Sequence, residues 1–200
     1  MVNGVYDGSS IYETVEPGAS SDEKIYFDPE DLTDYGIGDP TVISLFLLVR
    51  DRNDWDNVYF KDTVSLYPLG EEKAELFVPD GTGKVIFDND LVRLTMASLD
   101  YDDYWEEFTA VIMVENKTDK RLYIDFDDVR LNGAAFEPYM DTYTGPYGFA
   151  FEDGDFSLSK LTEAGIDVNK SVEVSFTLTV EDESGDYGKD ILKETVTFRT

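Results

Sequence analysis

Apolar and polar residues alternate over much of the C-terminal part of the chain. The most regular run covers Val172 to Val180, where every second residue is large and apolar. Because successive side chains of a strand point to opposite faces, this run predicts a β-strand with one buried face. Similar patterns predict strands at residues 85–87, 92–97, 108–114, 122–131 and 191–198.

Turn-forming residues separate these strands, as in Asn116-Lys117-Thr118-Asp119. About seven short strands with a turn signal every 8–12 residues predict an all-β chain folded as an immunoglobulin-like antiparallel β-sandwich. Cysteine is absent, so this prediction depends on the pattern alone and not on the disulfide that many such domains share.

An internal repeat is visible at an offset of 129 residues. Residues 3–37 align without a gap to residues 132–166 with eight identities, where chance gives about two. Beyond this stretch the offset drifts by two or three residues, so that residues 44–49 match 175–180 and residues 62–64 match 194–196. We therefore predict a tandem repeat whose N-terminal copy is incomplete, because that copy has no equivalent of roughly residues 84–130.

The repeat predicts the domain organisation. Residues 1–69 form the incomplete sandwich copy without its early strands, residues 70–83 are the linker, and residues 84–200 form the complete sandwich. Open sheet edges are adhesive, so residues 1–68 are expected either to pack on the second copy or to complete their sheet with another chain.

Each copy also contains signals for one short helix. In the first copy Asp28 can cap a helix that begins at Pro29 and ends at Gly36. In the second copy Ser157 or Ser159 can cap the helix, and Gly165 ends it in a left-handed turn.

Composition excludes several classes of function. The net charge of −28, from 44 acidic and 16 basic residues, argues against nucleic acid and against docking on anionic membranes. The longest apolar run, Val42 to Val49, is too short to insert in a bilayer, and the opening Met1-Val2-Asn3-Gly4 has no signal-peptide character. Without histidine or cysteine, the chain has no Ser-His-Asp or Cys-His catalysis, and no pair among its many carboxylates is marked as catalytic. We therefore expect no enzyme activity, with glycoside cleavage by a pair of carboxylates as the alternative left open.

Aromatic residues gather in one connecting segment of the second copy, where the first copy has small or polar residues. Tyrosine and tryptophan rings on loops suit sugar stacking or a protein-binding hot spot, and the alternative is that they cover a face of the second copy. The candidate ligand- or partner-binding residues are Tyr139, Tyr143, Tyr147, Phe149 and Trp105.

Acidic residues cluster at residues 51–56, 100–103 and 125–128. Such loops supply the oxygen ligands that calcium takes, but none has the EF-hand spacing, and solvated turns are the alternative interpretation. No other cofactor or metal is expected.

Residues 111–133 and 157–180 resemble the immunoglobulin-like repeat modules of uncharacterised secreted proteins and lipoproteins of Gram-positive bacteria. The resemblance extends over residues 85–200 and in part over residues 1–68, and it implies an extracellular or cell-surface location. The lipobox cysteine that anchors a lipoprotein is absent from this chain. The expected function is a non-catalytic surface or secreted module for protein binding or domain spacing, with carbohydrate binding through exposed aromatic rings as the alternative.

Overall fold

The computed structural model describes residues 1–6, 8–27, 29–102, 104–183 and 188–200. Their contacts divide the chain into two units, Met1–Val78 and Pro79–Thr200, which are described separately below. The boundary between the two units falls inside the stretch 70–83 that the sequence analysis assigns to a linker.

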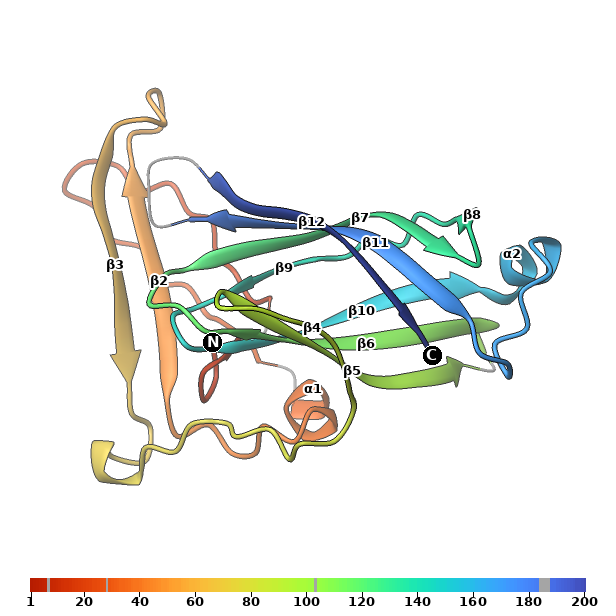
Figure 1. The fold of residues 1–200 in the computed structure, drawn as a ribbon. Helices are drawn as coiled ribbons and strands as arrows, with labels where there is room; N and C mark the ends of the chain where they lie inside the picture. Colours follow the sequence, from red (N-terminus) through yellow and green to blue (C-terminus); the bar gives the residue numbers. More distant parts are fainter. Residues whose placement is uncertain (7, 28, 103, 184–187) are drawn as a thin grey trace. The chain divides into compact units, whose positions relative to one another are not determined.

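The C-terminal unit is built from two antiparallel sheets (Figure 1). In the first sheet the order is β10-β6-β5-β4, and in the second it is β12-β11-β7, with β8 and β9 both paired to β7. The strands are β4 (Lys84–Asp88), β5 (Val92–Asp102), β6 (Glu107–Asn116), β7 (Leu122–Leu131), β8 (Ala134–Ala135), β9 (Asp141–Thr144), β10 (Phe149–Ser157), β11 (Glu173–Asp182) and β12 (Lys189–Arg199).

This arrangement confirms the expected all-β sandwich. The strands β5, β6 and β10 share one sheet, while β7, β11 and β12 share the other. An immunoglobulin-like sandwich distributes its A, B and E strands and its C, F and G strands in the same way.

The core of the C-terminal unit lies between these two sheets. The alternating residues of β11 and β7 meet there, and the rings of Phe126 and Phe176 pack edge to face at 5.3 Å between centroids. Leu94, Ile124 and Leu178 are fully buried, which agrees with the alternation in the sequence.

The N-terminal unit contains one long hairpin and little other regular structure (Figure 1). The hairpin pairs β2 (Ile43–Arg50) with β3 (Val58–Leu66). The remaining elements are β1 (Val5–Tyr6), α1 (Pro29–Asp34) and the 3₁₀ helix η1 (Glu71–Lys73).

Both units contain the same asparagine–glycine turn. Asn3 and Gly4 have φ angles of 48° and 86°, and Asn132 and Gly133 have 48° and 84°. In each unit the turn folds the chain back on itself, bringing Val2 opposite Val5 and Leu131 opposite Ala134. Two positive φ angles are the signature of a type I′ turn, which asparagine and glycine adopt at the lowest steric cost.

The two helices also end alike. In α1 the N–H of Ile37 donates to the carbonyl of Leu32 at 2.8 Å, and after α2 (Leu158–Glu163) the N–H of Ile166 donates to Leu161 at 2.9 Å. The glycines Gly36 and Gly165 have φ of 68° and 69° and provide the left-handed residue of this C-terminal cap, as expected.

The side-chain cap expected at the start of α2 is not formed. Ser157 is the N-cap residue of α2 but its hydroxyl makes no capping hydrogen bond, and it lies 2.9 Å from the hydroxyl of Ser159. Ser157 occupies the predicted N-cap position, but the prediction of a side-chain cap is wrong, because its hydroxyl lies beside that of Ser159 and bonds no backbone N–H of the first turn. Asp28, the expected cap of α1, lies outside the described residues.

The hairpin β2–β3 has the same register as the pair β11–β12. Leu45 lies opposite Val64 as Phe176 lies opposite Val196. Each pair also has one bulge at the matching position, between Val49 and Arg50 in β2 and between Val180 and Glu181 in β11. A strand register is set by its apolar pattern, so this agreement reflects the same pattern of inward-facing residues in both units.

Candidate functional site

The tyrosines predicted as a binding site lie partly on β9, which is paired with β7. Tyr143 lies opposite Tyr123, with 4.9 Å between the ring centroids. The Arg121 guanidinium stacks 4.6 Å above the ring of Tyr143 and leaves that ring half-buried. Tyr143 therefore stabilises the β7–β9 pairing and offers little of its ring to a ligand.

Asp141 organises this cluster. Its Oδ2 accepts hydrogen bonds from the hydroxyls of Tyr123 and Tyr139, both at 2.8 Å. These bonds favour the neutral phenols, so the pKa of Tyr139 is raised by the hydrogen bond to Asp141, and the pKa of Tyr123 is raised by burial and by the same carboxylate. The ring of Tyr139 is nevertheless 83% exposed.

Two further carboxyls of this region have raised pKa values. Burial raises the pKa of Glu152 on β10 to about 8, although its Oε1 accepts a hydrogen bond from the N–H of Asp141 at 3.1 Å. Burial, followed by the charge of Asp127, raises the pKa of Asp125. Tyr123, Tyr139 and Glu152 are thus all hydrogen-bonded to Asp141, and the charge of Asp141 also contributes to the raised pKa of Asp125.

Tyr147 and Phe149 lie in the loop after β9 and at the start of β10. The N–H of Tyr147 donates to the carbonyl of Thr118 at 2.9 Å, and its ring is 67% exposed. Phe149 is half-buried and lies opposite Glu115 of β6. Tyr147 is thus presented to solvent by a turn anchored to the loop that follows β6.

Trp105 lies at the tip of the hairpin between β5 and β6. The Oδ1 of Asp102 accepts the N–H groups of Tyr104 and Trp105 at 2.7 and 2.9 Å, and the two exposed rings meet edge to face at 4.8 Å. Tyr104 was not among the predicted site residues, although its position directly before Trp105 was a signal in the sequence.

The predicted aromatic residues do not form one surface. Trp105 precedes the first residue of β6, whereas Tyr147 is bound to Thr118 just beyond its last residue. A strand rises about 3.3 Å per residue, so the length of β6 puts roughly 30 Å between the two rings. The row of rings that carbohydrate binding would use is therefore divided between the two ends of the sandwich.

Asp51 and Asp102 of the predicted acidic clusters bond N–H groups of turns, whereas residues 125–128 lie inside strand β7 and not in the solvated turn that was the alternative interpretation. Asp51 accepts the N–H of Asn53 at 2.7 Å and the hydroxyl of Tyr59 at 2.8 Å, and these bonds lower the pKa of Asp51. Within the described residues no three acidic side chains converge as metal ligands. Asp103, which belongs to one of the predicted clusters, lies outside the described residues.

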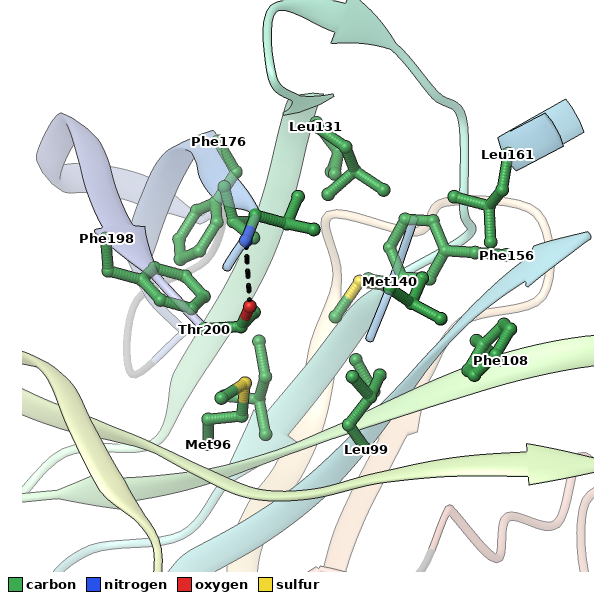
Figure 2. A pocket seen from close by; sticks show the side chains of 16 residues that line it. Met96, Leu99, Phe108, Leu131, Met140, Phe156, Leu161, Phe176, Phe198 and Thr200 are labelled. Carbon is green, nitrogen blue, oxygen red and sulfur yellow. Dashed lines mark hydrogen bonds between the residues drawn. The ribbon is translucent and has the colours of Figure 1, made fainter. Parts of the chain in front are cut away.

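A cavity of about 60 Å³ lies between the two sheets of the C-terminal unit (Figure 2). Its walls are almost entirely apolar side chains, among them Met96, Met140 and Phe176, while Thr200 closes one side by accepting the N–H of Val172 at 3.1 Å. The cavity is smaller than the roughly 150 Å³ of a cavity that admits benzene. We interpret it as a packing defect of the core.

The least expected surface is the hairpin of the N-terminal unit. Leu47, Val49 and Val64 are 40%, 51% and 38% exposed. The residues at the corresponding positions of β11 and β12 in the C-terminal unit, Leu178, Val180 and Val196, are 0%, 0% and 4% exposed. The name inward face is used below for the β2–β3 residues that correspond to core residues of β11–β12, namely Ile43, Leu45, Leu47, Val49, Phe60, Val64 and Leu66.

Comparisons with known proteins add no family to this description. The chain matches no protein-family model and no curated protein. In the part of the chain that the structure describes, no helix is long and apolar enough to cross a membrane.

Proposed function

We propose that this chain is a non-catalytic protein-binding module of a secreted or cell-surface protein, and that it binds through the inward face of the β2–β3 hairpin. The observation that carries the proposal is the exposure of Leu47 and Val49 on β2. The residues at the corresponding positions of β11, Leu178 and Val180, are completely buried. Contiguous exposed apolar surface of this kind marks interaction sites.

The proposal includes the repeat. The shared turn at Asn3 and Asn132, the shared helix ends at Gly36 and Gly165 and the shared hairpin register support an N-terminal unit that is an incomplete copy of the C-terminal one. Such a copy has one sheet of the sandwich and lacks the strands that would cover it. Its apolar face is then a surface that another polypeptide must cover.

Two variants of the full chain test this function. Leu47→Lys combined with Val49→Lys places charges on the inward face, and Thr177→Lys combined with Thr195→Lys on the outer face of β11–β12 is the matched control. We expect a protein partner from culture supernatants of Gram-positive bacteria to bind the wild type and the control, and to rebind in purified form with a micromolar Kd. Loss of binding only in the first variant supports the proposal, and equal binding by all three chains contradicts it.

A separate measurement addresses the carbohydrate alternative. The exposed pair Tyr104 and Trp105 is the feature that favours it, although the rings are perpendicular and form no flat platform. Retention of the wild type on immobilised glycans, abolished by Trp105→Ala, would replace the protein-binding proposal.

A further inference from the structure

Within the described residues of the N-terminal unit, β2 and β3 form a two-stranded sheet, with no further strand along most of β2 and no second sheet of that unit packed on it. In the C-terminal unit β7 pairs with β11 along its whole length, from Leu131 opposite Val174 to Leu122 opposite Asp182. In the N-terminal unit the corresponding contact exists only at the beginning of β2. Val2 lies opposite Ile43, and the main chains of Met1 and Ser44 exchange two hydrogen bonds of 3.0 Å.

The rest of β2 has an open edge. From Leu45 to Arg50 the strand is paired with β3, and no second strand lies along it among the described residues. Since Ser44 directs its N–H and carbonyl to this edge, strand alternation directs those of Leu48 to the same edge. The inward-face residues Leu47 and Val49 direct theirs to β3.

The strand that fills this place in the C-terminal unit has a definite chemistry. Its inward residues Leu122, Ile124 and Phe126 are buried against the core, and two basic residues, Lys120 and Arg121, precede them. Lys120 forms an ion pair with Asp182 at the end of β11, whereas Arg121 stacks on Tyr143. In the N-terminal unit Asp51 occupies the position of Asp182, opposite Asn57 as Asp182 is opposite Lys189.

We infer that the partner of this module donates a β-strand that pairs antiparallel with β2 along its open edge, in the place that β7 occupies beside β11. The donated segment belongs to a separate polypeptide and has a Lys or Arg followed by alternating large apolar residues. Its backbone pairs with the edge at Leu48, its apolar side chains lie beside Leu47 and Val49 and extend the inward face, and its basic residue meets Asp51. This inference rests on the proposed function and names the partner's binding mode.

A strand donated by another polypeptide accounts for the open edge of β2, which a second copy of this chain stacked on the inward face would leave unpaired. Two copies stacked through their inward faces would leave both β2 edges open, and each brings a net charge of −28 to the contact. In a second copy the strand of suitable chemistry, β7, is already paired with β11 and β9. A foreign strand led by a basic residue meets neither obstacle.

A peptide with the sequence of residues 120–130 is the probe, because it is a working example of the donor chemistry. We expect it to bind the full chain with a Kd of about 10–100 µM and to slow amide hydrogen exchange within Ile43–Arg50 by about tenfold or more. In β7 the N–H of Asp125 points to β11, while that of Phe126 points away and donates to Met140. N-methylation of the peptide at Asp125 should therefore weaken binding about tenfold or more, and N-methylation at Phe126 should change it less than about threefold.

Protein variants separate pairing at the edge from burial of the face. Leu48→Pro removes an N–H from the open edge and leaves the inward face intact, whereas Thr63→Pro removes an N–H from the far edge of β3 and is the matched control. We expect about tenfold or greater loss of peptide binding for Leu48→Pro and less than about threefold for Thr63→Pro. The two N-methylated peptides give the same answer without altering the protein, so a Leu48→Pro chain that fails to fold does not remove the test.

Four results would overturn the inference: no binding at millimolar peptide, equal binding of both N-methylated peptides, protection that appears in Glu173–Asp182 instead of β2, or dimerisation through the hairpin that the peptide does not compete with. If natural partner binding is lost in Leu47→Lys/Val49→Lys but survives Leu48→Pro, the protein-binding function stands and strand donation falls. If partner binding survives both, the proposed function falls as well.

Discussion

The hairpins β2–β3 and β11–β12 have the same register, the same bulge and the same inward apolar pattern, yet one is exposed and the other forms a core. The difference lies in what surrounds them. The pair β11–β12 has β7 beside it and a second sheet across from it, whereas among the described residues of the N-terminal unit β2–β3 has Met1 and Val2 at one end. Identical local patterns can therefore produce either a core or a binding surface, and the choice depends on distant strands.

Truncation of the leucines at corresponding positions of the two hairpins, Leu47 and Leu178, should give the largest difference in unfolding free energy. Leu178→Ala leaves a cavity in a closed core and is expected to cost about 2–4 kcal/mol of unfolding free energy. Leu47→Ala removes a half-exposed side chain and should cost less than about 1 kcal/mol. Guanidinium denaturation with amide exchange resolved for each hairpin gives both values. Equal costs would mean that the inward face is covered in solution.

Stability of the C-terminal unit should depend on pH through Glu152. Its pKa is raised from 4.5 to about 8 by burial, so the folded state holds a proton that the unfolded chain releases. The stabilisation is complete below pH 4.5 and is lost as pH rises through 8. With allowance for solvent screening of the half-buried carboxyl, unfolding free energy should fall by about 1–3 kcal/mol across this interval.

Glu152→Gln is the control for this pH dependence. It keeps an acceptor for the N–H of Asp141 and removes the titration of Glu152, so most of the fall with pH should disappear from the C-terminal unit, leaving the part due to Asp125 and Glu181, whose pKa values are also raised by burial. The N-terminal hairpin should show the same amide exchange profile, corrected for intrinsic rates, in both chains. An unchanged pH dependence in the variant would assign the effect to other carboxyls.

For the turn asparagines Asn3 and Asn132, unlike the leucines, the substitution in the N-terminal unit should cost more stability than the one in the C-terminal unit. The side chain of Asn3 donates to the carbonyls of Ile37 and Asp39 and accepts the N–H of Val42, whereas Asn132 accepts only the N–H of Glu173 among the described contacts. Both have φ of 48°, so the backbone strain of an alanine is shared. Asn3→Ala should cost about 1–3 kcal/mol and Asn132→Ala about 1 kcal/mol. Thermal unfolding of the two variants, with exchange at the N-terminal unit, measures the contrast.

The helix-ending glycines should behave alike. Gly36 and Gly165 have φ near 70°, and an added Cβ at either meets no atom within 4 Å. Alanine at either position should therefore cost only the backbone strain, about 1 kcal/mol. Costs that differ by more than about 1 kcal/mol would argue against equivalent helix ends in the two units, and the same denaturation experiment measures them.

The sequence predicted the sandwich, the strands and the helix ends because each depends on short-range patterns. A few neighbouring residues are enough to predict a strand from the alternation at Val172 to Val180. The same holds for the helix ends predicted from Gly36 and Gly165. The serine cap of α2 was wrong because a residue type at the N-cap does not fix where its hydroxyl points, and that of Ser157 lies beside Ser159 instead of accepting a backbone N–H. The predicted aromatic site depended on distant parts of the chain, since Trp105 and Tyr147 lie at opposite ends of β6.

By itself, the sequence determined that Ile43–Val49 and Val174–Val180 are strands with one apolar face, because a period of two is a property of the local backbone. Only the tertiary structure decided which of these faces is buried. Burial requires strands brought from far along the chain, and the neighbouring strand β7 and the opposite sheet do this for Leu178, whereas the described strands of the N-terminal unit provide no such cover for Leu47. Hydrophobic pattern specifies what a face can pack against, and topology determines whether anything is there.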